Sequence, residues 1–298
     1  MPVNIRSKTI INNMSIGSEE FGGPSILPHG LFYYYDLRES GSFDSENNKL
    51  LDLSGNENDA SLNHTFFTPD FVSDGEASYL DYSVTGSEDE ENLGGMAVIP
   101  DSDKFEYLRG SDFEFTSTIW FNLNNFERNQ SFSALKDPNI RYYYNGYSMY
   151  YNWLQWDYKI YSSTNYLFHG NSSYDIPTTN HNYYNNGAPT NQWKNITITF
   201  NNDDGFKFYD DGSLYQSFGV YNNYQHKWGW TRGSGGVLTE ASGNIQFSVF
   251  GANPGVSGDI SNNQGQFTSK INLCAFYTRA LSSDEVSTNY NLISSRFS

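Results

Sequence analysis

The chain has 298 residues, enough for one large all-β domain or two small ones. Its formal net charge of -17 argues against nucleic acid or an anionic membrane as a partner, because contacts with phosphate would be repulsive. Aromatic residues make up 17% of the chain, and aromatic side chains favour strands over helices.

The number of cysteines and the lengths of the apolar runs indicate where the protein is made and whether it crosses a membrane. Cys274 is the single cysteine, so the sequence excludes an intrachain disulfide. Its place in an alternating run favours a buried, small hydrophobic side chain over a nucleophile. Residues 1–18 have no apolar run of signal-peptide length, and no window approaches the roughly 18 apolar residues of a membrane span. We therefore expect a protein made in a cytoplasm, without a membrane span.

The first predicted segments are an arm and the start of a domain. Residues 1–28 contain Gly22, Gly23 and Pro24 and have no clear period, which favours an extended arm or tether. We assign residues 29–298 to one domain. A strand is expected in L-F-Y-Y-Y-D at 31–36. The run S-G-N-E-N at 54–58 predicts a turn, because Gly and Asn tolerate positive φ.

Alternating runs predict further strands along the chain. Strands are expected at 78–82, 97–100, 113–121, 192–200 and 245–251. Asp211 and Gly212 stand between two alternating runs and predict a hairpin turn. Alternation also predicts a core, whose members include Phe115, Ile119, Ile198, Phe208, Phe247 and Val249.

The last stretch, residues 270–297, predicts a strand followed by a helix. Ile271, Leu273, Ala275 and Tyr277 alternate with other residues, as in a half-buried strand. A capping box is expected at Ser282 and Glu285, with Leu281 as its hydrophobic staple.

These segments, in this order, resemble landmarks of laminin G-like jelly rolls of the concanavalin A-like superfamily. The resemblance rests on D-L-S-G-N-E-N at 52–58, A-V-I-P at 97–100, the strands at 113–121, 192–200, 206–214 and 245–251, and the ending at 270–297. That ending is most similar to copies found in virion proteins of tailed phages. The resemblance implies an all-β, concanavalin A-like jelly-roll β-sandwich of two antiparallel sheets, with an N-terminal arm and a short C-terminal helix.

The same resemblance implies a function. It favours a phage virion structural protein, either a head decoration or a tail or fibre component, located in the virion. Its expected partners are other virion proteins, further copies of the chain and host surface polysaccharide. Two alternatives stay open: a carbohydrate-binding module or adhesin not tied to a virion, and a glycoside-active enzyme.

Two insertions, near 136–191 and 219–244, have no counterpart in the short family pattern, and long insertions often serve binding or assembly. Sugars present apolar C–H faces that lie on aromatic rings, while amides and carboxylates fix their hydroxyls. The candidate sugar or partner contacts are Trp153, Trp156, Tyr224, Trp228 and Trp230. The alternative interpretation is aromatic packing within the core or at an interface. Residues 147–161 alternate enough to form a strand pair of the sandwich.

Calcium is the one candidate cofactor of this chain. Relatives on this fold carry the ion at the sandwich edge, and loop carboxylates suit its coordination by six to eight oxygens. The candidate ligands are Asp81, Asp89, Asp203 and Asp204, with plain surface charge as the alternative. Asn272 stands where family members often have Asp, which weakens the analogy.

Catalytic motifs are missing from the sequence. No strand carries the alternating carboxylates of a glycosidase, the five histidines lack zinc-ligand spacing, and no G-x-S-x-G elbow occurs. From these absences we predict that the chain is not an enzyme.

Overall fold

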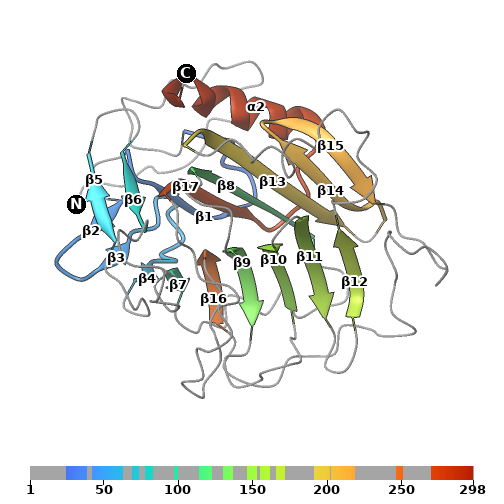
Figure 1. Cartoon of the computed structure of the whole chain (residues 1–298), viewed down its shortest axis with the longest axis horizontal. Helices are drawn as coiled ribbons and strands as arrows, with labels where there is room; N and C mark the ends of the chain where they lie inside the picture. The colour runs from blue at the N-terminus through green and yellow to red at the C-terminus, as the bar shows by residue number, and fades with distance from the viewer. Residues whose placement is uncertain are drawn as a thin grey trace, which may run out of the picture.

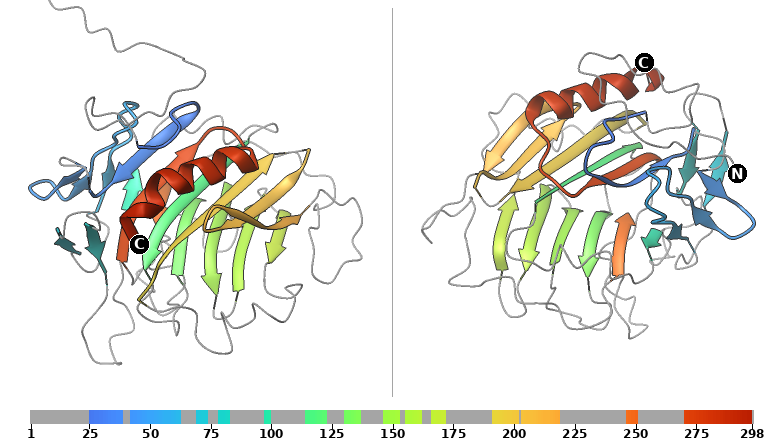
Figure 2. Two further views of the ribbon diagram at one scale, coloured as in Figure 1. Left: turned by 90° about the horizontal axis from the view of Figure 1, so that it is seen from above. Right: turned by 180° about the vertical axis from the view of Figure 1, so that it is seen from behind.

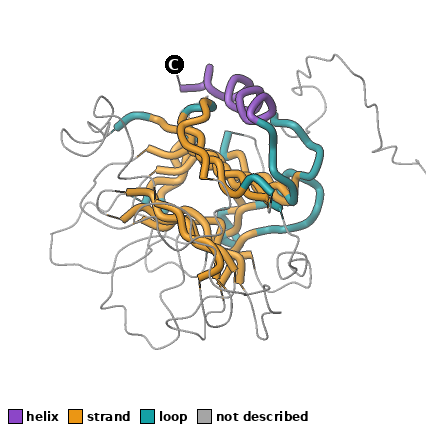
Figure 3. Tube along the Cα trace, turned by 90° about the vertical axis from the view of Figure 1, so that its right-hand side faces the viewer, coloured by secondary structure: helices purple, strands orange, loops and turns teal. Residues whose placement is uncertain are grey.

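The computed structural model describes residues 25–38, 42–62, 69–73, 78–82, 97–99, 114–122, 130–136, 146–152, 155–161, 166–171, 191–201, 203–218, 246–250 and 270–297. These residues form two antiparallel sheets and one short C-terminal helix (Figure 1). The sheets lie as two layers, and the helix lies outside one of them (Figure 3). The predicted all-β sandwich is confirmed.

Sheet A has the strand order β15-β14-β13-β8-β17-β6-β5, and β1 also pairs with β17. Its strands are β1 (Leu31–Asp36), β5 (Asp70–Val72), β6 (Tyr79–Asp81), β8 (Phe115–Asn122), β13 (Trp193–Asn201), β14 (Gly205–Asp210), β15 (Ser213–Phe218) and β17 (Lys270–Tyr277). Strands from distant parts of the sequence therefore meet at the centre of this sheet.

Sheet B has the order β12-β11-β10-β9-β16-β7-β4-β3-β2. Its strands are β2 (Phe43–Asp44), β3 (Lys49–Leu50), β4 (Ala60–Ser61), β7 (Ala97–Ile99), β9 (Gln130–Lys136), β10 (Gly146–Asn152), β11 (Gln155–Tyr161), β12 (Tyr166–Asn171) and β16 (Gln246–Phe250). For β9 to β12 the structure describes the course and pairing of the backbone. The pairing of β10 with β11 fits the strand pair expected within 147–161.

The face of sheet A that lies toward sheet B carries much of the predicted core. Phe115 stacks on Phe200 and on Phe276, with ring centroids 5.7 Å apart in both pairs. The core prediction is confirmed for Phe115, Ile119, Ile198, Phe208 and Val249, all of which are buried. Phe247 belongs to β16, but its side chain lies outside the described part.

The opposite face of sheet A, the outer face, is covered by helix α2 (Ser283–Ser294), which lies across the strands in Figure 2. Val286 and Ile293 of the helix pack with Trp120 and Leu273 of the sheet in one buried cluster. The strands β8, β13 and β17 are therefore buried on both faces, which explains why every residue of β8 is buried.

The start of α2 has the predicted capping box. The backbone N–H of Glu285 donates to Ser282 Oγ at 3.3 Å, and the Ser282 N–H donates to Glu285 Oε2 at 2.9 Å. Arg279 adds two hydrogen bonds to the same carboxylate, of 2.9 and 2.7 Å. These contacts place the helix directly after β17.

The end of the chain is tied to β1 through a buried ion pair. A 3-10 turn, η3 (Ser295–Phe297), follows α2 and places Arg296 Nη1 2.7 Å from Asp36 Oδ2, with both side chains at most 3% exposed. The Tyr34 hydroxyl donates to the same oxygen at 2.6 Å. Burial, and next the charge of Asp36, raises the pKa of Tyr34 well above its usual value. A neutral Tyr34 hydroxyl and the Arg296 guanidinium thus both donate to the buried Asp36 carboxylate.

Candidate functional site

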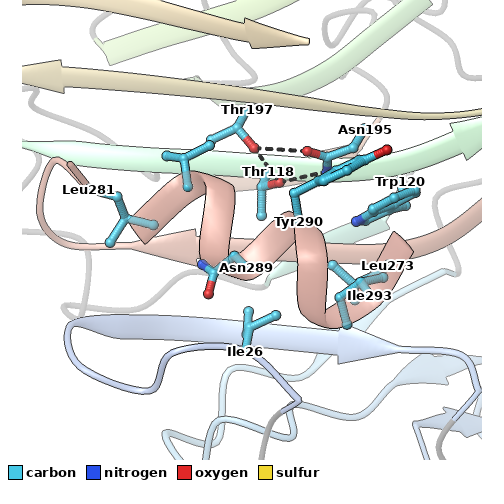
Figure 4. A pocket seen from close by; sticks show the side chains of 11 residues that line it. Ile26, Thr118, Trp120, Asn195, Thr197, Leu273, Leu281, Asn289, Tyr290 and Ile293 are labelled. Carbon is cyan, nitrogen blue, oxygen red and sulfur yellow. Dashed lines mark hydrogen bonds between the residues drawn. The ribbon is translucent and has the colours of Figure 1, made fainter. Parts of the chain in front are cut away.

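A small cavity lies between α2 and the outer face of sheet A. Three polar side chains meet on its sheet side: Thr118 Oγ1 and Thr197 Oγ1 are 2.7 Å apart, and Asn195 Nδ2 donates to Thr118 Oγ1 at 3.1 Å (Figure 4). Asn289 and Tyr290 line it from the helix side (Figure 4). Its volume of about 10 Å³ leaves room for roughly one water molecule. The cavity therefore belongs to the packing of α2 and is too small for a sugar.

A second group of side chains lies where the outer face passes the C-terminal end of α2. Cross-strand pairing places Trp193 of β13 opposite Asn122 of β8, Asn122 opposite Lys270 of β17, and Lys270 opposite Asp81 of β6. Directly paired residues point to the same face of a sheet. We call this group, with two neighbouring rings, the rim cluster: Tyr79, Asp81, Asn122, Trp193, Lys270 and Phe297.

Aromatic contacts hold the rim cluster together. The ring of Trp193 lies 4.8 Å from that of Phe297 and 5.6 Å from that of Tyr79, centroid to centroid. Phe297 also stacks on the buried Trp120 at 4.6 Å, which joins the rim cluster to the core under α2. Tyr79, Trp193 and Phe297 are half-buried, so the rim cluster lies at the surface of the described structure.

Charged and amide groups surround these rings. Lys270 Nζ lies 5.0 Å from the centre of the Tyr79 ring, within cation–π range, and 4.0 Å from Asp81 Oδ2. The side chain of Lys270 is 25% exposed and that of Asp81 is 21% exposed. Asn122 is buried, and its Oδ1 accepts no hydrogen bond from any residue that the structure describes. The group thus combines ring faces with donors and acceptors.

The turn at 54–58 is held by one carboxylate. Asp52 Oδ1 accepts from the N–H groups of Tyr34 and Ser54, both at 2.9 Å. Its Oδ2 accepts from Ser54 Oγ at 2.7 Å and from the Asn58 N–H at 3.0 Å. Four donors occupy the two oxygens, so Asp52 fastens the turn to β1 and is not free for a metal ion.

The structure places the predicted calcium ligands apart. Asp81 is level with the start of β13, whereas Asp203 and Asp204 follow the end of this nine-residue strand, about 30 Å away at the usual rise per residue. Asp204 is bound to Lys207 at 2.8 Å, and this contact is the main cause of its lowered pKa. Asp89 lies outside the described residues, among which no group of three His, Cys, Asp or Glu side chains could hold a metal.

The predicted sugar contacts are mostly beyond the described part of the chain. Trp153, Tyr224, Trp228 and Trp230 lie outside it. Trp156 lies in β11, where its backbone pairs with that of Tyr151. The rings of the rim cluster were not among the predicted contacts, because they come from strands far apart in the sequence and no local run of aromatic residues marks them.

Cys274 and Asn272, which the sequence analysis singled out, both lie in β17 and are buried. Cys274 is buried, as predicted, and burial raises the pKa of its thiol well above the usual value. Asn272 is buried at a register shift in β17, where its Nδ2 donates to the carbonyl of Ser78 at 2.6 Å. The amide at this position thus links β17 to the start of β6.

No protein-family model and no curated protein matches the chain. Among solved structures it is similar to the binding domain of Paraclostridial Mosquitocidal Protein 1, with a TM-score of 0.54 and 16% identity, over 89% of this chain and 52% of that chain. It is also similar to botulinum neurotoxin type C, whose cell entry depends on interaction with two ganglioside molecules, with a TM-score of 0.50 and 15% identity, over 89% of this chain and 52% of that one.

A third similar structure is a Trypanosoma rangeli sialidase in complex with sialic acid, with a TM-score of 0.51 and 14% identity, over 88% of this chain and 32% of that chain. The chain thus spans between a third and about half of the length of these matched chains. At such identities the similarity shows the fold alone. The fold is a β-sandwich that also occurs in a toxin binding domain and in a sialidase.

The prediction that the chain is not an enzyme was wrong, because sialidases are among the proteins that share its fold. That prediction rested on missing sequence motifs. The rim cluster shows why this was a weak basis: a sheet brings together residues more than a hundred positions apart, and such a group leaves no short motif. The fold is compatible with binding and with catalysis.

No helix among the described residues is both long enough and apolar enough to cross a membrane.

Proposed function

We propose that this chain is a glycan-binding β-sandwich domain displayed on a phage particle, as a head decoration or as a tail or fibre component. The observation that carries the binding part is the rim cluster, where half-buried Tyr79, Trp193 and Phe297 lie beside amide, ammonium and carboxylate groups. Rings with a few placed polar groups are the usual lining of a sugar site. The lectin-like fold supports the same function.

The virion part of the proposal rests on the C-terminal segment. Residues 270–297 resemble the ending of tailed-phage copies, and they form a strand and capped helix in the order that this resemblance implied. The formal net charge of -17 supports a role outside nucleic acid packaging, because like charge repels the phosphate backbone. The expected partners are neighbouring virion proteins, further copies of the chain and host surface polysaccharide.

Glycan binding is tested by incubating the purified full chain with an array of surface polysaccharides and defined oligosaccharides. We expect saturable binding to a subset of them. Released reducing sugar is measured in the same incubations, so that binding and cleavage are read separately. Absence of binding and of cleavage across the array would overturn the glycan part of the proposal.

The virion part needs a separate measurement, because a free adhesin would bind glycans equally well. Mass spectrometry of purified particles from the phage that encodes the chain should detect it at a fixed ratio to the major capsid protein. If it is absent from particles and present only in the surrounding lysate, the alternative of a free carbohydrate-binding module replaces the virion proposal.

A further inference from the structure

The rim cluster is assembled across strands that the sequence keeps far apart. Its polar row crosses four adjacent strands of sheet A, from Trp193 through Asn122 and Lys270 to Asp81. The rings of Tyr79 and Trp193 meet at 5.6 Å although the strands that carry them are not neighbours, so both rings lean over the residues between them.

One buried polar atom of the rim cluster has no hydrogen-bond partner within the described part of the chain. Asn122 is 7% exposed, and its Oδ1 accepts no hydrogen bond from the described residues. An unsatisfied buried acceptor costs free energy unless a water molecule or a ligand supplies a donor. A hydroxyl group that reaches this oxygen would remove the cost, which distinguishes the cluster from ordinary aromatic packing.

The charges of the rim cluster bear on the class of ligand that it can take. Lys270 is its single cation, and Asp81 Oδ2 lies 4.0 Å from the Lys270 ammonium group. Asp70 is paired with Asp81 on the next strand and adds a second carboxylate at the edge of the cluster. The whole chain carries a formal net charge of -17. An anionic sugar would meet repulsion at close range and at a distance, whereas uncharged hydroxyls can donate to Asp81 and accept from Lys270.

On the basis of the proposed glycan binding, we infer that the rim cluster is the sugar site and that it takes an uncharged pyranose. The sugar lays its C–H face on Trp193, whose ring is supported by contacts with Phe297 and Tyr79. Its hydroxyls exchange hydrogen bonds with Asp81, Lys270 and Asn122. Acidic sugars, including sialic acid, are the rejected class.

The test uses ligand-observed NMR on the full chain with lactose, maltose and cellobiose as neutral probes, and sialyllactose as the acidic counterpart of lactose. We expect binding of at least one neutral probe, and weaker binding of sialyllactose than of lactose. For Trp193→Ala we expect an affinity lower by about tenfold or more, the size typical of removing an aromatic anchor. For Asp81→Asn we expect a smaller loss, because an amide still accepts one hydrogen bond.

The matched control is Phe71→Ala, which removes a ring that is 41% exposed on β5 but lies outside the cluster. Its affinity should equal that of the unaltered chain. Since Trp193→Ala also removes packing, thermal unfolding must show that each variant is folded, and Asp81→Asn provides a second variant that keeps the side-chain volume.

The outcomes separate the inference from the function on which it rests. If glycans bind and neither Trp193→Ala nor Asp81→Asn changes the affinity, the site is wrong and glycan binding stands. If sialyllactose binds more tightly than lactose, the ligand class is wrong. If no probe and no member of the polysaccharide array binds, both the site and the glycan-binding function are overturned.

Discussion

Single residues decide how closely α2 can approach sheet A. Gly212 follows β14 with a φ of +72°, and a Cβ built on it would lie 2.5 Å from Tyr290 Cβ of the helix. Real carbon atoms do not approach so closely, and the contact is with the base of the Tyr290 side chain, which cannot swing away. Glycine is therefore required here both for the backbone conformation and for space.

A comparison of two glycine substitutions separates these two requirements. Gly55 has a φ of +87°, but no atom lies within 4 Å of the position that a Cβ would take there. Gly55→Ala should lower the free energy of unfolding by about 1–2 kcal/mol, the cost of a left-handed L-residue. Gly212→Ala should cost about 1–3 kcal/mol more, because it also overpacks the helix contact.

Urea unfolding followed by tryptophan fluorescence measures both values. Equal losses for Gly212→Ala and Gly55→Ala would mean that α2 moves away from the hairpin at little cost, contrary to the close contact between Gly212 and Tyr290.

At the scale of elements, the N-terminus of α2 carries a charge-dependent contact. Hydrogen bonds from Arg279, with further help from Ser282, lower the pKa of Glu285 from 4.5 to about 2. A carboxyl group whose pKa is lowered by folding stabilises the fold above its unfolded pKa, and this contribution is lost as pH falls toward the folded pKa. The helix should therefore loosen between about pH 4.5 and pH 2.

Glu285→Gln tests this contact, because the amide keeps an acceptor for the capping box but has no charge. We expect the variant to be less stable than the unaltered chain at pH 7, with the difference shrinking steadily below pH 4.5. Thermal unfolding at a series of pH values gives the curve. Asp284→Asn removes the exposed neighbouring carboxylate and is the control; a pH-independent difference for Glu285→Gln would contradict the assignment.

Some elements could be predicted from sequence because their signals are local. The capping box joins Ser282 to a residue three positions away, and the hairpin turn at Asp211 and Gly212 is a two-residue signal. Alternation likewise identified Phe115 and Ile119 of β8 as core residues, and both are buried. Each of these depends on neighbours in sequence, so no knowledge of the strand order is needed.

The rim cluster could not be predicted in the same way. Trp193 and Tyr79 become neighbours only because β13, β8, β17 and β6 lie in that order, and the order is set by the packing of the whole sandwich. The sequence drew attention instead to stretches dense in Trp and Tyr. Likewise, the distance between Asp81 and Asp203 follows from the position of β6 relative to β13. The alternation of apolar residues does not predict that position.

At the scale of the whole molecule, segments from both ends of the described chain cover the outer face of sheet A. Helix α2 covers it from the C-terminal side, and residues 25–28 join from the N-terminal side. Ile26 is 5% exposed and packs in the same cluster as Val286 and Ile293. These four residues belong to the segment that the sequence assigned to an arm, and that domain boundary stays a prediction.

Hydrogen bonds fix this junction. The Leu27 N–H donates to Asn289 Oδ1 and the Tyr277 hydroxyl donates to the Leu27 carbonyl, each at 2.9 Å. Asn289 Nδ2 donates to the Tyr277 hydroxyl, also at 2.9 Å, which closes a ring of contacts between the segment, α2 and β17. Removal of residues 25–28 would take away the donor to Asn289 Oδ1 and the acceptor of the Tyr277 hydroxyl.

Two truncated chains locate where the folded unit begins. A chain lacking residues 1–24 keeps this junction, and a chain lacking 1–28 loses it. We expect the shorter chain to have a free energy of unfolding lower by about 2–5 kcal/mol, the range for losing a buried isoleucine and its neighbouring hydrogen bonds. Comparing the two truncations with each other, rather than with the full chain, isolates residues 25–28 from the segment before them. Ile26→Ala in the full chain should account for a large part of the difference. If the two truncations unfold at the same urea concentration, these four residues are not part of the folded unit, and the arm extends to residue 28.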